Sequence, residues 1–353
     1  MKRDPRRPAL LSAAVLALAA HSARACDTDL ACSLNGVCTA GACVCDAPWG
    51  GAACATLTFA VTPASAKNIF PSSDPHNTWS GPIAGPDADG FFHAFVPLYQ
   101  PASLWHVITT LHGKAAAPTG PFDWASEPNI SSAAINPGFL EYVDGATGQT
   151  VYSLWTGGDV LVAGTLNGPF VQKARYAGVN PAPVFVDGAF FLTTQHTTEV
   201  LTAPSLGGPW SFFSNITQPP ASIMNYTVED PRMWVDRRGR WHIINHGYNT
   251  HQFGNCGASH VSAHFFSTDG KTWLWSDQPY GHTVQFDDGT EHTYATLERP
   301  YLVFDPSSGQ PAYLVLAVDL VAEDACPSKS DCCDCCKFSD HAGTLVVKLA
   351  ASS

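Results

Sequence analysis

Two carboxylate-proline segments in the second half of the chain carry residue types suited to acid and base chemistry. Residues 229–231 read E-D-P, and residues 298–300 read E-R-P. A carboxylic acid and a carboxylate held on either side of one bond can divide the roles of proton donor and base. A carboxylate at a strand start, beside a proline and near the cation of Arg232, is also placed to have its pKa tuned. The candidate catalytic residues are therefore Glu229, Asp230 and Glu298.

The alternative role for these carboxylates is structural, because carboxylates at strand starts also accept hydrogen bonds from arginines and neighbouring strands. Residues in similar settings are candidates for binding a substrate: Arg232, Arg299, Asn136, Asn180, His246 and Trp79. Trp79, like the tryptophans at 234 and 241, is suited either to stacking on a ligand ring or to filling the core between blades.

The histidines of the same region offer a second kind of site. His242 and His246 fall on one face of a predicted strand, since side chains alternate along a strand, and His260 and His264 follow in the sequence. Four residues along a strand is too wide a spacing for two ligands of one ion without further help. We therefore favour hydrogen-bonded histidines lining a pocket, and predict no metal site and no cofactor.

The elements that position these residues are repeated. Five times, a proline-led strand runs into a turn with a glycine and then into a second apolar strand. The copies begin at Gly81-Pro82, Asn136-Pro137, Asn180-Pro181, Asp230-Pro231 and Arg299-Pro300, and their turn glycines are Gly90, Gly148, Gly188, Gly239 and Gly309. A repeat of roughly 40–60 residues built from short strands is typical of a β-propeller with one repeat per blade. We predict an all-β, five-bladed β-propeller in which the residues beside the prolines converge on one axial pocket.

The start of the chain predicts export. A basic beginning, an apolar run over residues 9–20 and an A-R-A site at residues 23–25 indicate a secretory signal over residues 1–25. Arg24 disfavours a lipid anchor on Cys26, and no later segment reads as a membrane span. The net charge of −12 argues against a nucleic acid or an anionic membrane surface as partner. We expect a secreted, extracellular protein.

Six cysteines between Cys26 and Cys54 are spaced C-x5-C-x5-C-x4-C-x-C-x8-C, with an ending C-x-C-x2-P-W-x4-C. This pattern resembles an EGF-like domain over residues 26–54, a unit too short to fold without its bridges. The resemblance implies the pairs Cys26–Cys38, Cys32–Cys43 and Cys45–Cys54. It implies no calcium site, because the acidic cluster that calcium-binding modules carry before the first cysteine is missing. A spacer role is favoured over binding an extracellular protein.

The remaining cysteines and the sequons also fit an exported chain. The later cysteines are Cys256, Cys326, Cys332, Cys333, Cys335 and Cys336. In an oxidising compartment, disulfides that cross-link the last blade are favoured over a metal-binding cysteine cluster. The spacing of these cysteines leaves their pairing open. Three N-x-S/T sequons predict glycosylation at Asn129, Asn215 and Asn225.

Three segments of the second half resemble a known superfamily. They read V-E-D-P-R-M-W-V-D-R-R-G-R-W-H-I-I-N-H from residue 228, H-F-F-S-T-D-G-K-T-W from residue 264 and T-L-E-R-P-Y-L-V-F-D from residue 296. Glycine-proline-aromatic turns at 120–122, 168–170 and 208–210 recur at similar places in the repeat. The segments resemble the five-bladed propeller glycosidases (arabinanases, levansucrases and invertases), and most of all secreted proteins similar to glycoside hydrolase family 43. The resemblance covers most of residues 59–349.

The resemblance implies which residues perform catalysis. In these glycosidases the carboxyl groups come from first strands, namely an Asp in blade one, an Asp in blade three and a Glu in an E-x-P of blade four. Glu229 matches the last and would be the acid that protonates the leaving oxygen. The other two positions hold Gly81 and Asn180, which depart from the pattern. Loop residues that could replace the missing base are Asp74, Asp87 and Asp89, and Glu298 is a candidate partner from blade five.

The stretch S-T-D-G-K-T-W also resembles the Asp-box turn of sialidases. A sialidase would need three converging arginines and a tyrosine nucleophile. The arginines of the propeller region are Arg175, Arg232, Arg237, Arg238, Arg240 and Arg299. Several of them fall in one turn, so a sialidase is disfavoured.

Two functions are therefore carried forward for residues 55–353. The first is a secreted, carbohydrate-active protein, a glycoside hydrolase or hydrolase-like chain that binds a polysaccharide or other glycan at the propeller axis. The second is a non-catalytic extracellular protein that binds a glycan or a protein with a degenerate glycosidase propeller. The residues at 81 and 180 favour the second, and the intact E-D-P-R and E-R-P segments favour the first.

Overall fold

The computed structural model describes residues 26–60, 67–70, 77–99, 107–125, 130, 136–195, 197–218, 227–248, 262–285, 290–294, 297–319 and 342–351. Several expectations lie outside these residues: the signal at 1–25, Asp74, the sequons at Asn129 and Asn225, His260, and the cysteines from Cys256 to Cys336. No helix in the described ranges has the length and apolar character needed to cross a membrane.

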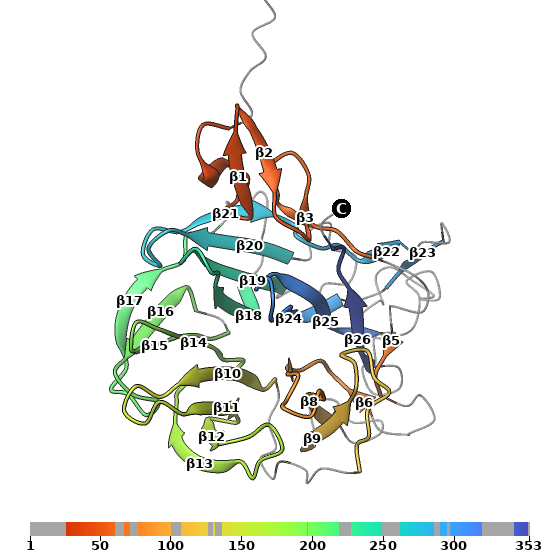
Figure 1. Cartoon of the computed structure of the whole chain (residues 1–353), viewed down its shortest axis with the longest axis vertical. Coiled ribbons are helices and arrows are strands. Elements are labelled where there is room, and N and C mark those ends of the chain that lie inside the picture. Colours follow the sequence, from red (N-terminus) through yellow and green to blue (C-terminus); the bar gives the residue numbers. More distant parts are fainter. Residues whose placement is uncertain are drawn as a thin grey trace, which may run out of the picture.

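The main body is a five-bladed β-propeller, as the repeat predicts (Figure 1). Blade two consists of β10 (Gly138–Val143), β11 (Thr150–Thr156), β12 (Asp159–Ala163) and β13 (Val171–Arg175). Blade three consists of β14 (Ala182–Val186), β15 (Ala189–Thr193), β16 (Glu199–Ala203) and β17 (Ser211–Asn215). Blade four consists of β18 (Thr227–Val235), β19 (Trp241–Tyr248), β20 (Ser262–Ser267) and β21 (Leu274–Asp277). All neighbouring strands within these blades are antiparallel.

Blades one and five complete the ring. Blade one is built around β8 (Phe92–Tyr99), which pairs with β6 (Asn77–Thr78), β7 (Ile83–Ala84) and β9 (Val107–Ala115). Blade five contains β24 (Leu297–Phe304), β25 (Pro311–Asp319) and β26 (Ala342–Lys348), and its fourth strand is β5 (Lys67–Asn68) from the front of the chain. A hairpin of β22 (Thr283–Gln285) and β23 (Glu291–Thr293) lies between blades four and five in sequence. An N-terminal strand therefore closes the ring by hydrogen bonding to the last strand.

Each blade turns from its first to its second strand at the predicted glycine. The φ angles of these glycines are 87°, 68°, 81°, 74° and 72° at Gly90, Gly148, Gly188, Gly239 and Gly309. This left-handed conformation is open to glycine but costly for residues with a Cβ. The turn glycine is therefore what lets the second strand fold back against the first.

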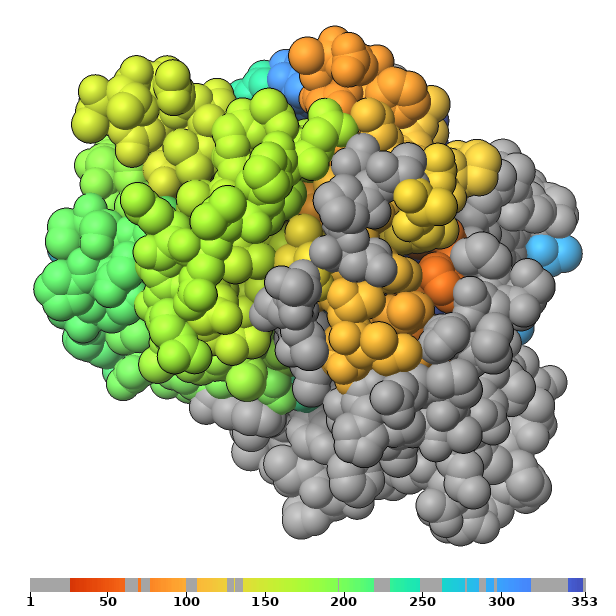
Figure 2. All heavy atoms as spheres, turned by 90° about the horizontal axis from the view of Figure 1, so that it is seen from below, coloured from red at the N-terminus to blue at the C-terminus, as the bar shows by residue number. Residues whose placement is uncertain are grey.

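The core consists of apolar side chains packed between neighbouring blades. One cluster joins Phe95 of blade one to Leu154 of blade two and to Val315 of blade five, all fully buried. Seen from below, the surfaces of blade one (orange) and blade two (yellow-green) lie next to each other (Figure 2). Such interdigitated apolar contacts, with about 25 cal/mol gained per Å² of apolar area buried, hold the blades in a fixed ring.

The front module carries three disulfides, which join Cys26 to Cys38, Cys32 to Cys43 and Cys45 to Cys54. These are the pairs that the EGF-like resemblance implies. The module contains the short 3₁₀-helix η1 (Asp29–Cys32), the hairpin of β1 (Gly36–Thr39) and β2 (Ala42–Cys45), and a pairing of β3 (Trp49–Gly50) with β4 (Thr56–Leu57).

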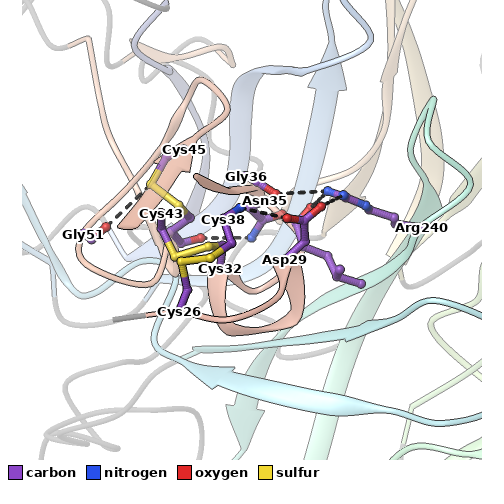
Figure 3. Close-up of a disulfide and its surroundings, with 12 residues drawn as sticks. Cys26, Asp29, Cys32, Asn35, Gly36, Cys38, Cys43, Cys45, Gly51 and Arg240 are labelled. Atoms are coloured by element: carbon purple, nitrogen blue, oxygen red, sulfur yellow. Dashed lines mark hydrogen bonds and ion pairs between the residues drawn. A yellow bond between two sulfur atoms is a disulfide. The ribbon is translucent and has the colours of Figure 1, made fainter. Parts of the chain in front are cut away.

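The front module packs against blade four instead of standing apart from it (Figure 1). Arg240, from the turn before β19, donates hydrogen bonds to the carbonyls of Leu34 (3.0 Å) and Gly36 (3.2 Å) and pairs with Asp29 (Figure 3). The rings of Trp49 and His264 lie 5.1 Å apart. The module and the propeller therefore share one packed interface with a charged edge.

Candidate functional site

Five residues with left-handed backbones form a ring at the propeller axis, one from each blade. They are Ser80, Asn136, Asn180, Asp230 and Arg299, with φ angles of 50°, 58°, 51°, 47° and 52°. Few residues other than glycine adopt such angles, and those that do often lie at functional sites. In β18 and β24 the strand register shifts at this point, which turns Asp230 and Arg299 out of the ladder. We call these five residues the axial ring.

The axial ring corrects the expected position in blade one. Ser80, and not Gly81, takes the place of the residues that precede prolines in the other blades. Gly81 stands where those blades have proline, and a Cβ there would lie 2.1 Å from the carbonyl oxygen of Phe95. The close approach of β8 therefore requires a glycine at 81. Neither Ser80 nor Asn180 supplies a carboxylate, so the departure from the glycosidase pattern stands.

Asp230 is the hub of the axial ring. Its Oδ1 accepts hydrogen bonds from the amide nitrogens of Asn136 (2.9 Å) and Asn180. Its Oδ2 lies 3.1 Å from Nδ1 of His246 and 3.3 Å from Nε of Arg299. Burial raises the pKa of Asp230, but the charge of Arg299 and the bond with His246 outweigh it and lower the pKa. Asp230 is therefore a buried, ionised carboxylate.

Two glutamates lie one residue before the ring positions and face the same imidazole. Nε2 of His246 is 3.4 Å from Oε2 of Glu229 and 3.8 Å from Oε2 of Glu298. The two carboxylate oxygens are thus at most about 7 Å apart, close enough for both carboxyl groups to reach one bound sugar. The side chains of Glu229 and Glu298 are 12% and 5% exposed.

The electrostatics of this cluster separate its members into charged and neutral groups. Burial lowers the pKa of His246, but the surrounding carboxylates, led by Glu298, raise it to about 10. Burial raises the pKa of Glu298 to about 7, although the cation of His246 opposes the rise. Oε1 of Glu298 has no hydrogen-bond partner among the described residues. Near neutral pH the cluster therefore holds Glu298 as a carboxyl group that can carry a proton beside Asp230, whose carboxylate stays ionised.

Arg299 is held by an aromatic corner, which changes the role expected for Trp79. Nη1 of Arg299 donates to the carbonyl of Trp79 (3.5 Å) and to the hydroxyl of Tyr99 (3.2 Å), and the guanidinium lies 5.7 Å from the Trp79 ring. Trp79 is only 2% exposed, so it positions Arg299 and cannot stack on a sugar. Trp234 and Trp241 are also buried in the core.

Arg232 lines the small pocket against the axial ring together with Asp230 and Arg299, and its role in binding a substrate stays a prediction. Its Nη1 donates to the carbonyl of Phe139 (3.2 Å), and its guanidinium lies 4.2 Å from the ring of Tyr301. These contacts place Arg232 deeper along the channel, beyond the axial ring.

The sequence missed three side chains that line the cluster. Gln195 donates to Glu229 and accepts from Asn180, and Tyr99 accepts from Arg299. Tyr280 is 1% exposed, its hydroxyl has no hydrogen-bond partner among the described residues, and burial raises its pKa well above the ordinary value, with Glu298 adding to the rise. Of these three residues, only Gln195 could have been inferred from the repeat. It lies opposite Val179 in blade three, as His246 lies opposite Glu229 in blade four.

Four other histidines form two buried, hydrogen-bonded pairs away from the cluster, here called relays. In blade four, Nδ1 of His242 is 3.0 Å from Nε2 of His264, and in blade one Nδ1 of His93 is 2.9 Å from Nε2 of His112. Asp87 bonds to His93 and to backbone amides of its own turn, including that of Asp89, so neither aspartate reaches the axis as a replacement base. His242 and His246 thus belong to different networks.

Three further expectations from the sequence concern a metal site, a sialidase arrangement of arginines and a glycosylated asparagine. Among the described residues, the one group of possible metal ligands close enough together is Cys26, Cys32 and Cys43, which are disulfide-bonded. The six propeller arginines do not converge: Arg175 pairs with Asp159, Arg237 with Pro306 and Ser307, and Arg238 and Arg240 with the front module. Asn215 is exposed at the end of β17, and its glycosylation stays a prediction.

Comparison with known proteins gives low-identity structural similarities. The GH43_1 enzyme from Xanthomonas citri superposes with a TM-score of 0.49 at 11% identity, over 82% of this chain and 93% of the enzyme. Its complex with xylotriose gives 0.49 at 12% identity, over 80% and 91%. A putative exo-beta-1,3-galactanase from Bifidobacterium bifidum gives 0.44 at 10% identity, over 77% and 91%. No protein-family model and no curated protein sequence matches the chain.

Proposed function

We propose that this chain is a secreted, carbohydrate-active protein that binds a glycan at the axial carboxylate cluster and hydrolyses a glycosidic bond there. The supporting observation is the pair of glutamates on one imidazole. Glu298 has a pKa of about 7, and its partner Glu229 lies within about 7 Å. Paired carboxyl groups held in unlike environments are the arrangement that acid and base catalysis requires.

The proposed roles follow from the local electrostatics. Glu298, which is protonated near neutral pH, donates its proton to the leaving oxygen, a role that the sequence resemblance assigns to Glu229. Glu229 is the carboxylate that activates water or attacks the anomeric carbon. Protonated His246 fixes both side chains, and its Nδ1–H points at Asp230, which Arg299 holds in turn. Asn136 and Asn180 have buried side-chain oxygens without a partner among the described residues, and they hold Asp230 in place.

The remaining parts of the proposal concern the front of the chain. Residues 1–25 would act as a cleaved secretory signal, residues 26–54 as an EGF-like domain, and residues 55–353 as the glycosidase-like propeller. Glycosylation at Asn129, Asn215 and Asn225 and a contact with an extracellular protein through the EGF-like domain belong to the same proposal. Peptide mapping of the secreted protein would test the cleavage site and the glycans.

The proposed hydrolysis is tested by Glu298→Gln and Glu229→Gln on a panel of plant, algal and matrix polysaccharides. Because general acid catalysis contributes about 10²–10⁴-fold, each variant should lose at least about 100-fold in kcat. The rate of the wild type should fall as pH rises through about 7, since Glu298 then loses the proton it must donate. Glu291→Gln, at an exposed position on β23, is the matched control and should behave as wild type. Equal cleavage by wild type and Glu298→Gln would refute the assignment of the acid.

A second function is favoured by the composition of the axial ring. Three of its members, Ser80, Asn136 and Asn180, are uncharged, and Asp230 is already bound by several donors. A ring of this kind suits a non-catalytic glycan-binding protein. In that case the wild type would bind oligosaccharides on a glycan array and release no product, and Glu298→Gln would keep its binding.

A further inference from the structure

The propeller channel contains two cavities beyond the axial ring. The smaller, of about 40 Å³, lies directly against the ring. The larger, of about 420 Å³, is lined by the first strands of all five blades, β7, β10, β14, β18 and β24. Arg232 and Tyr301 line both cavities, so this stacked pair separates them. The larger cavity therefore has a floor of its own and does not continue into the carboxylate cluster.

The walls of the larger cavity are mainly apolar, and Glu141, Arg232 and Arg237 add charged groups to the lining. Phe139, Val184, Met233, Leu302 and Phe304 contribute to them from four blades, and Ile83 contributes from the fifth. The rim lies at exposed blade turns that include Arg237 and Pro306. A volume of a few hundred Å³ with apolar walls and few polar groups is typical of a site for a small organic molecule.

The floor of this cavity carries a positive charge that lacks a counter-ion. No carboxylate in the described part of the chain lies within ion-pair distance of Arg232, and its Nε has no hydrogen-bond partner there. The other arginine of the cavity, Arg237, is bonded to the carbonyls of Pro306 (2.7 Å) and Ser307. A partly buried cation among apolar side chains is stabilised by an anion that hydrogen-bonds to it.

We propose that the larger cavity is a second binding site, separate from the carboxylate cluster, for a monocarboxylate with an apolar body. The carboxylate pairs with the guanidinium of Arg232 at the floor, and the body lies against Phe139 and Phe304. This inference goes beyond the proposed glycosidase function and does not depend on it. The planar fork of a guanidinium matches a carboxylate in two parallel hydrogen bonds, which favours this anion over a compact one.

Binding of 4-phenylbutyrate to the full secreted chain tests the proposal, with isothermal titration calorimetry as the readout. The uncharged 4-phenylbutanol, which has nearly the same body, should bind at least about tenfold more weakly because it cannot pair with Arg232. Arg232→Gln should weaken the acid by about tenfold or more and leave the alcohol unchanged. Arg232→Lys should keep part of the affinity, because the charge remains while the fork is lost.

Arg237→Gln is the matched control, since that guanidinium is already engaged at the rim, and it should leave binding of the acid unchanged. Equal binding of acid and alcohol to the wild type would overturn the proposal, and this comparison needs no variant to fold. Unchanged binding to Arg232→Gln, or no binding of the acid at millimolar concentration, would also overturn it.

Discussion

At the level of single residues, the buried ionisable groups respond to their surroundings in two ways. Around the axis, the neighbouring carboxylates raise the pKa of His246 and keep it protonated. In the relays of blades one and four, by contrast, burial keeps histidines neutral: it lowers the pKa of His112 to about 3 and that of His264 well below its ordinary value. The same side chain therefore serves as a fixed cation in one place and as a neutral hydrogen-bonding ring in another.

The lowered pKa values of His112 and His264 predict that the free energy of unfolding falls in acid. The unfolded chain takes up protons on His112 and His264 below about pH 6.5, while the folded chain leaves His112 unprotonated until about pH 3. Their contribution to stability is thus complete above pH 6.5 and is lost as pH falls toward 3. Each group adds a slope of up to about 1.4 kcal/mol per pH unit. His112→Gln should show a shallower fall in the free energy of unfolding between pH 6.5 and 4.5, measured by urea denaturation; an equal slope would contradict this account.

The candidate site could be predicted in part from single residues. In blades two to five the residues that precede the prolines meet at the axis, because each stands at the same point of a repeated strand. Gln195, just after β15, could be found only by comparison with His246 of blade four. Tyr99 and Tyr280 could not be found, because Tyr99 ends the second strand of blade one and Tyr280 follows β21, at no fixed distance in sequence from a proline. The burial of Trp79 also depends on the packing of several elements.

At the level of strands and turns, each blade needs a glycine in its first turn because the backbone there is left-handed. This requirement makes the repeat visible in the sequence. A Cβ at Gly239 would have no atom from outside the turn within 4 Å, so conformation and not space selects glycine there. The blade-one register was harder to predict, because Gly81-Pro82 looks like the X-Pro pairs of the other blades. Only the contact of Gly81 with β8 reveals the shift of one residue.

Gly239→Ala should therefore destabilise the protein by about 1–2 kcal/mol, the cost of a left-handed backbone with a Cβ. Gly164→Ala is the matched control: it also has open space around a Cβ, but its φ is not left-handed. That control should be neutral or stabilise the protein by up to about 1 kcal/mol, since alanine restricts the unfolded chain. Equal effects in thermal unfolding would show that turn conformation does not decide the choice of residue.

At the level of the whole molecule, the front module and the propeller form one packed body. Arg240 reaches from blade four into the module, where it bonds to two carbonyls and one carboxylate (Figure 3). Cys26, Cys32 and Trp49 belong to the same buried cluster as Trp234 and Leu314 of the propeller. The module therefore presents its free face in a fixed orientation relative to the axis.

Arg240→Ala should weaken this docking, because Asp29 and the carbonyls of Leu34 and Gly36 would lose their donor. Buried groups left without a partner cost about 1–3 kcal/mol. The fluorescence of Trp49, at the interface, should respond, and the free energy of unfolding should fall by that amount. Arg175→Ala removes an ion pair whose arginine is 76% exposed, and should cost less than about 1 kcal/mol. Equal losses for the two variants would contradict a docked module.

Ring closure by β5 has a consequence for how the chain is made. Strand β5 leaves the ribosome early, but its partner β26 is among the last strands synthesised. At 5–20 residues per second, β5 waits on the order of 15 to 55 s with an unpaired edge while the other blades assemble. A polypeptide cut short before Ala342 would never lose that edge, and unpaired edges promote aggregation. Only a chain that extends through β26 can therefore pair β5 and close the ring.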